Sequence, residues 1–379
     1  MVLQRSMLDQ KNALSLIQIK YAVHSGEDLT QDMSAKHEYK TLIRRSTMKC
    51  AVMGGGSWGT ALASVLAYHH TVYLWARDEK TVHSINQTRC NTKYLPNITL
   101  PDRLQASHNR REVLQDADLV VLVVPSQATR TFVQDIAPYV PSHSIIVNAS
   151  KGIENDSLCT MHQVLLQELP SSLHARLAFL SGPSFAKETV MQQATAVTVA
   201  ADNLHIAQQV QTWMNTPYFR VYSSDDVVGV ELGGAIKNVI AIAAGVADGL
   251  NLGYNTRAAL ITRGVAEMTR LALKMGAHPM TLAGLSGMGD LVLTCTGGLS
   301  RNRQVGVALG KGQPLEDILA HMQQVAEGVK TTLSVYQLAQ QQQVDMPIVQ
   351  EVYAMLYQNK PARLVLRDLM SRDLKVERV

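Results

Sequence analysis

A strand, a glycine-rich loop and a helix near residue 50 most constrain how this chain can fold. Residues 50–53 form a short apolar run, typical of a buried parallel strand, and Gly54, Gly56 and Gly59 follow at G-x-G-x-x-G spacing. The first glycine makes the tight turn, the second lets the backbone approach a pyrophosphate, and the third lets helix pack on strand. The predicted helix at residues 60–67 adds amide donors at its N-terminus. This context predicts a dinucleotide-binding loop; an ordinary glycine turn is the alternative.

Composition narrows the class of protein. With 379 residues, 46% hydrophobic and 17% charged, the chain suits a globular protein of two domains. A net charge of +4 gives little reason to expect nucleic acid as a partner, but it suits a small anionic ligand. We expect no membrane span, because no apolar run approaches the roughly 20 residues needed to cross a bilayer. The four cysteines are scattered without metal-ligand spacing, so we expect free thiols in a cytoplasmic protein and no metal.

The first 47 residues differ from the rest. They are polar and of mixed charge, with a weak helical pattern over residues 13–23. Their acidic residues argue against a transit peptide, and they lack the apolar core of a signal peptide. Met48 stands directly before the first strand. We expect residues 1–47 to be a dispensable or disordered extension, whether from an upstream start codon or as a tether.

Further apolar runs predict a mostly parallel sheet. Residues 71–75 are β-branched and aromatic, and residues 117–124 form a near-continuous apolar run typical of a strand buried on both faces. Other strands are predicted at residues 144–148, 176–180, 194–200 and 219–222, with a helix at 204–214. The sequence therefore predicts an α/β, Rossmann-like domain over residues 48–228. Its parallel core carries extra strands whose direction stays open.

The end of the second strand bears on cofactor choice. NAD-selective sites usually place an acidic residue there, whereas NADP-tolerant sites place an arginine. This chain has Ala76-Arg77-Asp78. Because Arg77 comes first, we predict NADP(H) as the preferred cofactor with NAD(H) tolerated; a solvated loop arginine is the alternative.

Residues 229–379 are predicted to form an all-helical domain. Residues 229–249 are apolar nearly all round, which is typical of a buried helix, yet Lys237 interrupts their middle. Its helical neighbours are small: Gly233, Gly234, Ala241 and Ala244. We therefore predict a functional ammonium in a shallow apolar trough; a lysine that snorkels at a helix crossing is the alternative. Further helices are expected at residues 255–275, 315–322, 330–342 and 346–357.

Two other stretches are predicted to meet an anion or a charged group. Lys151 follows the strand at residues 144–148, where such strands line a ligand crevice; a solvated lysine is the alternative. Residues 285–303 are expected to form a loop, in which Asp290 lies among apolar and small residues and should be paired. Residues 300–303 (Ser-Arg-Asn-Arg) open a short helix, and arginine forks beside a helix start suit a phosphate.

Five motifs, in order along the chain from about residue 49, resemble bacterial NAD(P)-dependent glycerol-3-phosphate dehydrogenase. They are Gly-Gly-Gly-Ser-Trp-Gly-Thr, Ala-Ser-Lys-Gly-Ile-Glu, Ser-Gly-Pro-Ser-Phe-Ala-Lys-Glu, Gly-Gly-Ala-Ile-Lys-Asn-Val and Ser-Arg-Asn-Arg. The resemblance implies reversible reduction of dihydroxyacetone phosphate to sn-glycerol 3-phosphate, which feeds phospholipid synthesis. It also implies a Rossmann-like domain, an all-helical C-terminal domain and a homodimer.

The resemblance also implies roles for single residues. Lys237 matches the proton donor and acceptor, with Asp290, Asn238 and Thr294 beside the chemistry. The implied substrate contacts are Lys151, Gly182, Ser184, Lys237, Asp290, Ser300, Arg301 and Asn302. The implied cofactor contacts are Gly54, Gly56, Ser57, Trp58, Gly59, Arg77, Lys151, Ala186, Arg301, Val325 and Glu327. Burial should lower the pKa of Lys237 and a nearby Asp290 should raise it, which would hold it near working pH.

Three rival interpretations remain open at this point. Other hydroxy-acid dehydrogenases share the two-domain layout, although the Ser-Arg-Asn-Arg cluster favours a phosphate substrate. Cys295 could act as a nucleophile in an oxidation through a thioester, although no histidine stands beside it. The third interpretation is a protein that binds NAD(P) without turnover, but such a protein would not need Lys237 together with Asp290.

Overall fold

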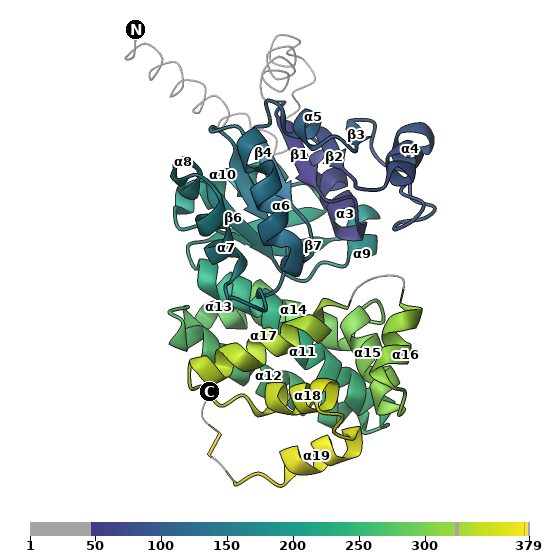
Figure 1. The fold of residues 1–379 in the computed structure, drawn as a ribbon, viewed down its shortest axis with the longest axis vertical. Coiled ribbons are helices and arrows are strands. Elements are labelled where there is room, and N and C mark those ends of the chain that lie inside the picture. Colours follow the sequence, from purple (N-terminus) through teal and green to yellow (C-terminus); the bar gives the residue numbers. More distant parts are fainter. Residues whose placement is uncertain (1–46, 323–325, 375, 378–379) are drawn as a thin grey trace, which may run out of the picture. The chain divides into compact units, whose positions relative to one another are not determined.

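The computed structural model describes residues 47–322, 326–374 and 376–377 (Figure 1). Met48–Val379 form one compact unit. The expected N-terminal extension, residues 1–47 with their weak helix, lies outside the described residues apart from Thr47.

The described part of the chain holds one eight-stranded sheet, in the order β3-β2-β1-β4-β5-β6-β7-β8. Its strands are β1 (Lys49–Met53), β2 (Thr71–Trp75), β3 (Leu104–Ser107), β4 (Leu119–Leu122), β5 (Ile145–Asn148), β6 (Leu177–Ser181), β7 (Thr195–Ala200) and β8 (Phe219–Ser224). Neighbouring strands are parallel except for β6 and β7, which are antiparallel. The predicted parallel core is confirmed, and the direction of the appended strands, left open by the sequence, is decided.

Alternating side chains of the central strands build two separate cores on the two faces of the sheet. In β1, Cys50 and Val52 join the core under α3, whereas Ala51 and Met53 join the core under α6 and α7. Both faces are therefore covered, which explains why the central strands are near-continuous apolar runs. The helices and turns of this half are α3 (Ser57–Leu66), α4 (Glu79–Thr88), α5 (Arg110–Leu114), η2 (Ser126–Ala128), α6 (Thr129–Ile136), η3 (Ala137–Tyr139), α7 (Met161–Glu168), α8 (Ser171–His174), α9 (Ala186–Val190) and α10 (Leu204–Met214).

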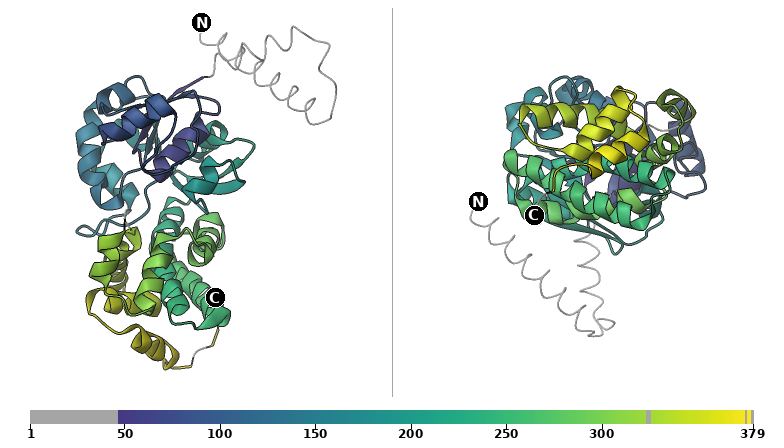
Figure 2. Two further views of the ribbon diagram at one scale, coloured as in Figure 1. Left: turned by 90° about the vertical axis from the view of Figure 1, so that its right-hand side faces the viewer. Right: turned by 90° about the horizontal axis from the view of Figure 1, so that it is seen from below.

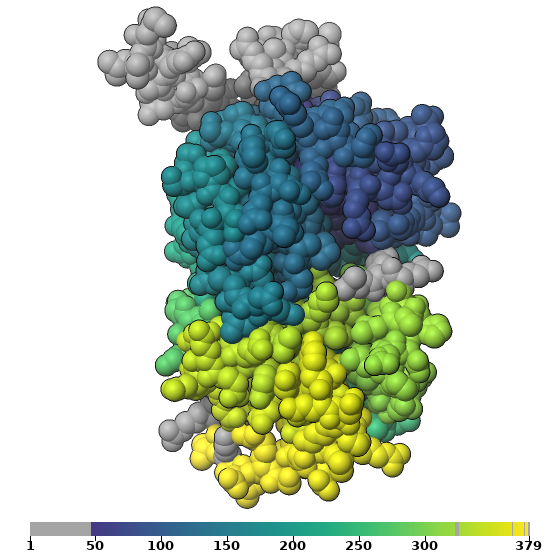
Figure 3. All heavy atoms as spheres, viewed as in Figure 1, coloured from purple at the N-terminus to yellow at the C-terminus, as the bar shows by residue number. Residues whose placement is uncertain are grey.

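After β8, the described residues are helical (Figures 1 and 2). The elements are α11 (Val227–Gly249), α12 (Gly253–Lys274), α13 (Pro279–Ala283), η4 (Leu285–Gly289), α14 (Asp290–Thr296), α15 (Arg301–Gly310), α16 (Leu315–His321), α17 (Glu327–Gln341), α18 (Pro347–Tyr357) and α19 (Ala362–Met370). The fold class, α/β with an all-helical C-terminal region, is confirmed. The space-filling view shows the helical half lying directly against the sheet half (Figure 3).

Two expectations need correction. The segment at residues 285–303 is largely not a loop, because η4 is one turn of π-helix and α14 continues it. The expectation that no segment could span a membrane is also wrong. By its length and its mean hydropathy of 1.6, α11 could cross a bilayer. The bent pair Pro279–Thr296 with Arg301–Gly310 also meets these criteria of length and hydropathy. However, 89% of the apolar window of α11 is buried inside the protein, as in the core helix of a globular domain.

Candidate active site

The glycine-rich loop has the geometry that its spacing predicts. Gly54 has φ +144°, a conformation that favours glycine, and a Cβ on Gly59 would lie 1.8 Å from the Gly54 carbonyl oxygen. A Cβ on Gly56 would meet nothing within 4 Å, so the backbone there is open to a ligand. Ser57 and Trp58 are the first two residues of α3, at the helix N-terminus that would face a pyrophosphate. These residues fit a dinucleotide.

The loop after β2 presents Arg77 as an exposed side chain, whereas the neighbouring Asp78 is already engaged. The Asp78 carboxylate caps α4, accepting from Lys80 N at 3.1 Å and from Thr81 Oγ1 at 3.2 Å. It also accepts from Lys93 Nζ at 3.2 Å, and this hydrogen bond is the main reason why the pKa of Asp78 is lowered. Asp78 is therefore poorly placed to serve as the acidic ribose contact of an NAD-selective site.

Lys237, Asp290 and Lys151 form a buried charged cluster. Lys237 Nζ, from the middle of α11, donates to Asp290 Oδ1 at 2.5 Å and to Thr294 Oγ1 at 3.1 Å. Lys151 Nζ donates to the other carboxylate oxygen, Asp290 Oδ2, at 2.6 Å. Lys237 is 7% exposed and Asp290 is 1% exposed. The expectation that Asp290 is paired is confirmed, and Lys237 does not snorkel to the surface.

The environment of this cluster sets the charge states. Burial lowers the pKa of Lys237 to about 8, with Asp290 opposing the shift and Lys151 adding to it. Burial works against the ionised form of Asp290, but the two lysines outweigh it and keep its pKa below the usual value. The cluster therefore carries a carboxylate and a lysine ammonium that can release its proton near neutral pH.

The trough beside Lys237 is lined by small residues, as expected, but the protein itself enters much of it. A Cβ on Gly234 would lie 2.6 Å from Ser181 Oγ and 3.5 Å from Lys151 Cδ. A Cβ on Gly233 would lie 2.5 Å from the carbonyl oxygen of Ser286, in η4. The small residues thus let the stem of Lys151 and the π-turn pack closely against α11.

The end of β6 closes the site from the sheet half. The Gly182 carbonyl accepts from Lys151 Nζ at 3.2 Å and from Ser184 Oγ at 2.9 Å. Ala186 is the first residue of α9, which packs on α3. Since β1, β5 and β6 run in the same direction, their carboxyl ends place the glycine loop, Lys151 and Gly182 at one edge of the sheet.

The remaining predicted residues come from α15 and α17. Ser300 caps α15 by accepting from Arg303 N at 3.2 Å, which confirms the predicted helix start, and Arg301 is the first residue of that helix. Burial raises the pKa of the half-buried Glu327 at the start of α17, while the charges of Arg301, Lys151 and Lys237 oppose the rise. Glu327 therefore lies within the electrostatic field of this cluster. Val325 lies outside the described residues.

A chain of amide hydrogen bonds was not foreseen. Gly328 N donates to Asn302 Oδ1 at 3.0 Å, and Asn302 Nδ2 donates to Asn238 Oδ1 at 2.9 Å. Both asparagines had been singled out, but nothing in the sequence joined them, and Gly328 carried no signal beyond following Glu327. Their sequence neighbours Lys237, Arg301 and Glu327 are all predicted site residues.

The rival nucleophile is a poor candidate for the chemistry. Cys295 is 0% exposed, and burial raises its pKa to about 12, so it offers no thiolate for a thioester route.

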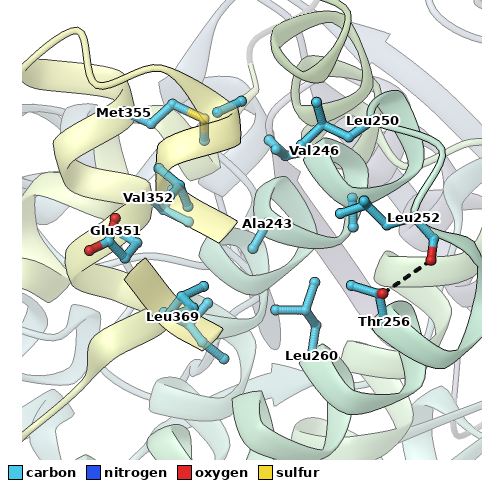
Figure 4. A pocket seen from close by; sticks show the side chains of 14 residues that line it. Ala243, Val246, Leu250, Leu252, Thr256, Leu260, Glu351, Val352, Met355 and Leu369 are labelled. Carbon is cyan, nitrogen blue, oxygen red and sulfur yellow. Dashed lines mark hydrogen bonds between the residues drawn. The ribbon is translucent and has the colours of Figure 1, made fainter. Parts of the chain in front are cut away.

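A cavity between α11, α12, α18 and α19 is lined by apolar side chains such as Val246, Leu260 and Met355, with Glu351 as its one acidic residue (Figure 4). Among the described residues, no three His, Cys, Asp or Glu side chains group as a metal site.

Comparison with known proteins agrees with this geometry. Residues 49–207 match the family model described as NAD-dependent glycerol-3-phosphate dehydrogenase N-terminus, and residues 226–367 match the C-terminus model of the same family. A glycerol-3-phosphate dehydrogenase [NAD(P)+] of Geobacter sp. (strain M21) is 54% identical over 332 residues, 87% of this chain and 99% of the relative. That of Leptospira biflexa is 54% identical over 333 residues, 88% of this chain and 100% of the relative.

A solved structure supports the same assignment. The crystal structure of glycerol-3-phosphate dehydrogenase from Coxiella burnetii has a TM-score of 0.82 and 38% sequence identity, covering 86% of this chain and 99% of that one. The family matches cover both the sheet half and the helical half of the chain. The chain therefore belongs to the NAD-dependent glycerol-3-phosphate dehydrogenase family.

Proposed function

We propose that this protein interconverts dihydroxyacetone phosphate and sn-glycerol 3-phosphate with NAD(P)H and thereby supplies glycerol 3-phosphate for phospholipid synthesis. The observation that carries the proposal is the buried Lys237–Asp290–Lys151 cluster, in a chain whose glycine loop fits a dinucleotide. The test is NADPH oxidation with dihydroxyacetone phosphate, run beside a 2-oxo carboxylic acid of similar size. Turnover of the carboxylic acid alone would reject the phosphate substrate, and no oxidation of NADPH with either would reject the enzyme.

We assign the chemistry to the residues of the cluster. The nicotinamide, when bound, supplies hydride to the carbonyl carbon of the substrate, and the carbonyl oxygen then needs a proton. Lys237 stabilises the negative charge on that oxygen and protonates it. Asp290 and Thr294 hold the ammonium at 2.5 and 3.1 Å, so its position is set before the substrate arrives.

The phosphate group does not react, and we assign it to the neighbouring polar residues. Lys151 supplies positive charge, and Arg301 supplies a fork of hydrogen-bond donors. Ser300 and Asn302 contribute from the start of α15. Gly182 and Ser184 line the same edge of the sheet. Phosphate binding would position the carbonyl against the cofactor, so its binding energy assists the chemical step.

We expect opposite pH dependences for the two directions of the reaction. Reduction uses the ammonium form of Lys237, whereas oxidation uses the neutral amine. Since the pKa of Lys237 lies at about 8 in the ligand-free fold, kcat/KM for reduction should fall as the pH rises through about 8, and kcat/KM for oxidation should rise over the same range. The check is kcat/KM in both directions between about pH 6 and 10, because kcat/KM reports the pKa values of the free enzyme. Profiles that move together would show that Lys237 is not the proton carrier.

We propose NADP(H) as the preferred cofactor, because Arg77 is exposed and Asp78 is engaged by α4 and Lys93. Arg77→Asp should raise the KM for NADPH at least about tenfold more than that for NADH, since a charged hydrogen bond to the 2′-phosphate is worth about 1.5–3 kcal/mol. Steady-state kinetics with both cofactors provide the check. Equal effects would place Arg77 away from the 2′-phosphate.

We propose three units: an extension at residues 1–47, a cofactor domain at 48–228 and a helical domain at 229–379. The first boundary is supported by the compact unit Met48–Val379, and the second by the separate family matches at residues 49–207 and 226–367. A protein that starts at Met48 should fold and keep its turnover, which gel filtration and the NADPH assay would check. Insolubility, or a loss of more than about tenfold, would make the extension structural.

We also propose a cytoplasmic homodimer. The support is the likeness to the bacterial family, together with the four cysteines, which are all free. Light scattering on the purified full chain would give the oligomeric state directly.

A further inference from the structure

Two helices of the site, α11 and α15, touch each other through glycines. Gly245 and Gly249 of α11 meet Gly306 and Gly310 of α15, and a Cβ on any of the four would overlap a backbone carbonyl oxygen of the other helix. Within each helix the two glycines are one turn apart, so they lie on one face. The two backbones are therefore in direct contact, and this seam has few side-chain ridges that would stop one helix from sliding along the other.

The contacts along the seam share one register. A Cβ on Gly306 would meet the carbonyl oxygen of Ile242, 64 positions earlier, and Asn302 Nδ2 donates to Asn238 Oδ1 across the same 64 positions. Residue numbers rise together along the seam, so α11 and α15 run parallel. Because both helices rise by about 1.5 Å per residue, residues with this separation lie level with each other.

This register pairs two residues of the proposed chemistry. Arg301 follows Lys237 by the same 64 positions, so the two lie level on neighbouring helices. Both charges, together with that of Lys151, act on the pKa of Glu327, which places them around the same region. In the proposed function, Arg301 binds the substrate phosphate and Lys237 the carbonyl oxygen. The register of α15 on α11 therefore sets the distance between the groups that bind the two ends of the substrate.

An ion-pair cluster fixes α15 along the seam. Arg303 Nε and Nη2 both lie 2.7 Å from Asp248 Oδ2, near the end of α11. The other carboxylate oxygen, Asp248 Oδ1, accepts from Arg257 Nε of α12 at 2.9 Å. The side chain of Asp248 is 10% exposed, that of Arg303 21% and that of Arg257 20%. The guanidinium of Arg303, which the sequence had offered to a phosphate, is therefore already occupied by Asp248.

We propose that Arg303 and Asp248 are positioning residues that hold α15 in the register where Arg301 reaches the substrate phosphate while Lys237 reaches the carbonyl oxygen. This inference rests on the proposed function and deepens it, because it assigns the spacing between the two ends of the substrate to one pair of helices. The glycines bring the helices together, and the ion pair prevents movement along the seam. Arg303 and Asp248 act through Arg301 and do not contact the substrate.

Arg303→Gln tests this role. Asp248 stays paired with Arg257, so no carboxylate is left without a partner and the fold should hold. We expect kcat/KM for dihydroxyacetone phosphate to fall at least about thirtyfold, since a misplacement of about 1 Å can cost a hundredfold. With dihydroxyacetone, which has no phosphate, kcat/KM measured at high enzyme concentration should fall less than about threefold. General damage to the helical half would lower both values equally.

Arg257→Gln is the matched control. It removes hydrogen bonds to the same carboxylate from a side chain of similar exposure, but from α12 rather than α15. The Tm should fall by a similar amount in R257Q and R303Q, whereas kcat/KM for dihydroxyacetone phosphate in R257Q should fall less than about threefold. Arg303→Lys keeps one ion pair to Asp248 and should regain at least about fivefold over R303Q.

A double-mutant cycle completes the test. In an Arg301→Ala background, R303Q should cost less than about threefold, because the residue it acts through is gone. Equal losses from R303Q with both substrates or in both backgrounds, or an equal loss in R257Q, would overturn the proposal. If R303Q does not fold, Arg303→Lys takes its place in the same comparisons. Wild-type turnover of dihydroxyacetone phosphate is measured in the same series, so its absence would reject the proposed function separately.

Discussion

Lys237→Met is expected to lower turnover at least about a thousandfold while NADPH still binds, since charge stabilisation of the alkoxide is worth about 3–4 kcal/mol and the proton transfer is lost as well. Methionine keeps the shape of the lysine stem in the core of α11. Lys237 lies in the middle of α11 and is 7% exposed, so the change alters charge far more than packing. The cofactor site is built from other residues, chiefly the glycine loop and the loop after β2.

The measurements are single-turnover reduction of dihydroxyacetone phosphate and fluorescence titration with NADPH. Removing Lys237 leaves Asp290 paired to Lys151 at 2.6 Å, so the buried carboxylate keeps one partner and the protein should still fold. A variant that binds NADPH and keeps more than about a tenth of the wild-type turnover would defeat the mechanism.

Asp290→Asn should have the second largest effect, because the carboxylate holds both lysines. Without its charge, the two ammonium groups repel each other and the main influence that opposes the burial of Lys237 is lost, so the pKa of Lys237 should fall further. The lysine would then be mostly neutral at pH 7, and reduction should fall at least about a hundredfold. The declining limb of the pH profile for reduction should also move to lower pH, which a simple packing defect would not produce.

Stability should fall in the same variant, since Lys237 loses its buried partner and must give up its proton to stay buried, at a cost of about 3 kcal/mol. Urea unfolding of the two proteins at pH 7 would measure this cost. Asp102→Asn provides a matched control, because the side chain of Asp102 is fully exposed and pairs only at the surface with Arg89. An unchanged pH profile in D290N would show that Asp290 does not set the charge of Lys237.

Much of the fold could be predicted because its signals are local. The run at β1 and the three glycines lie within a dozen residues, and burial on both faces makes strands such as β4 apolar at every position. The four-residue β3 was missed because Leu104 and Ala106 are its only buried side chains, too few for a pattern. The amphipathic helices α4 and α6 were missed as well, since polar residues dominate their sequences. The π-turn η4 was taken for a loop because its glycines and serine predict irregular backbone.

The sequence by itself determined that Lys237 lies on a buried helix and that Asp290 lies among apolar neighbours. Periodicity reports which side chains leave water, because hydrophobic burial follows helix and strand geometry. Only the tertiary structure decided that these two residues, 53 positions apart, meet at 2.5 Å, and that Lys151, 139 positions from Asp290, joins them. It likewise decided which way the amide of Asn238 points, through a backbone N–H on another helix. Charge and hydrogen bonding depend on distances between atoms far apart in the chain, and no local pattern encodes those distances.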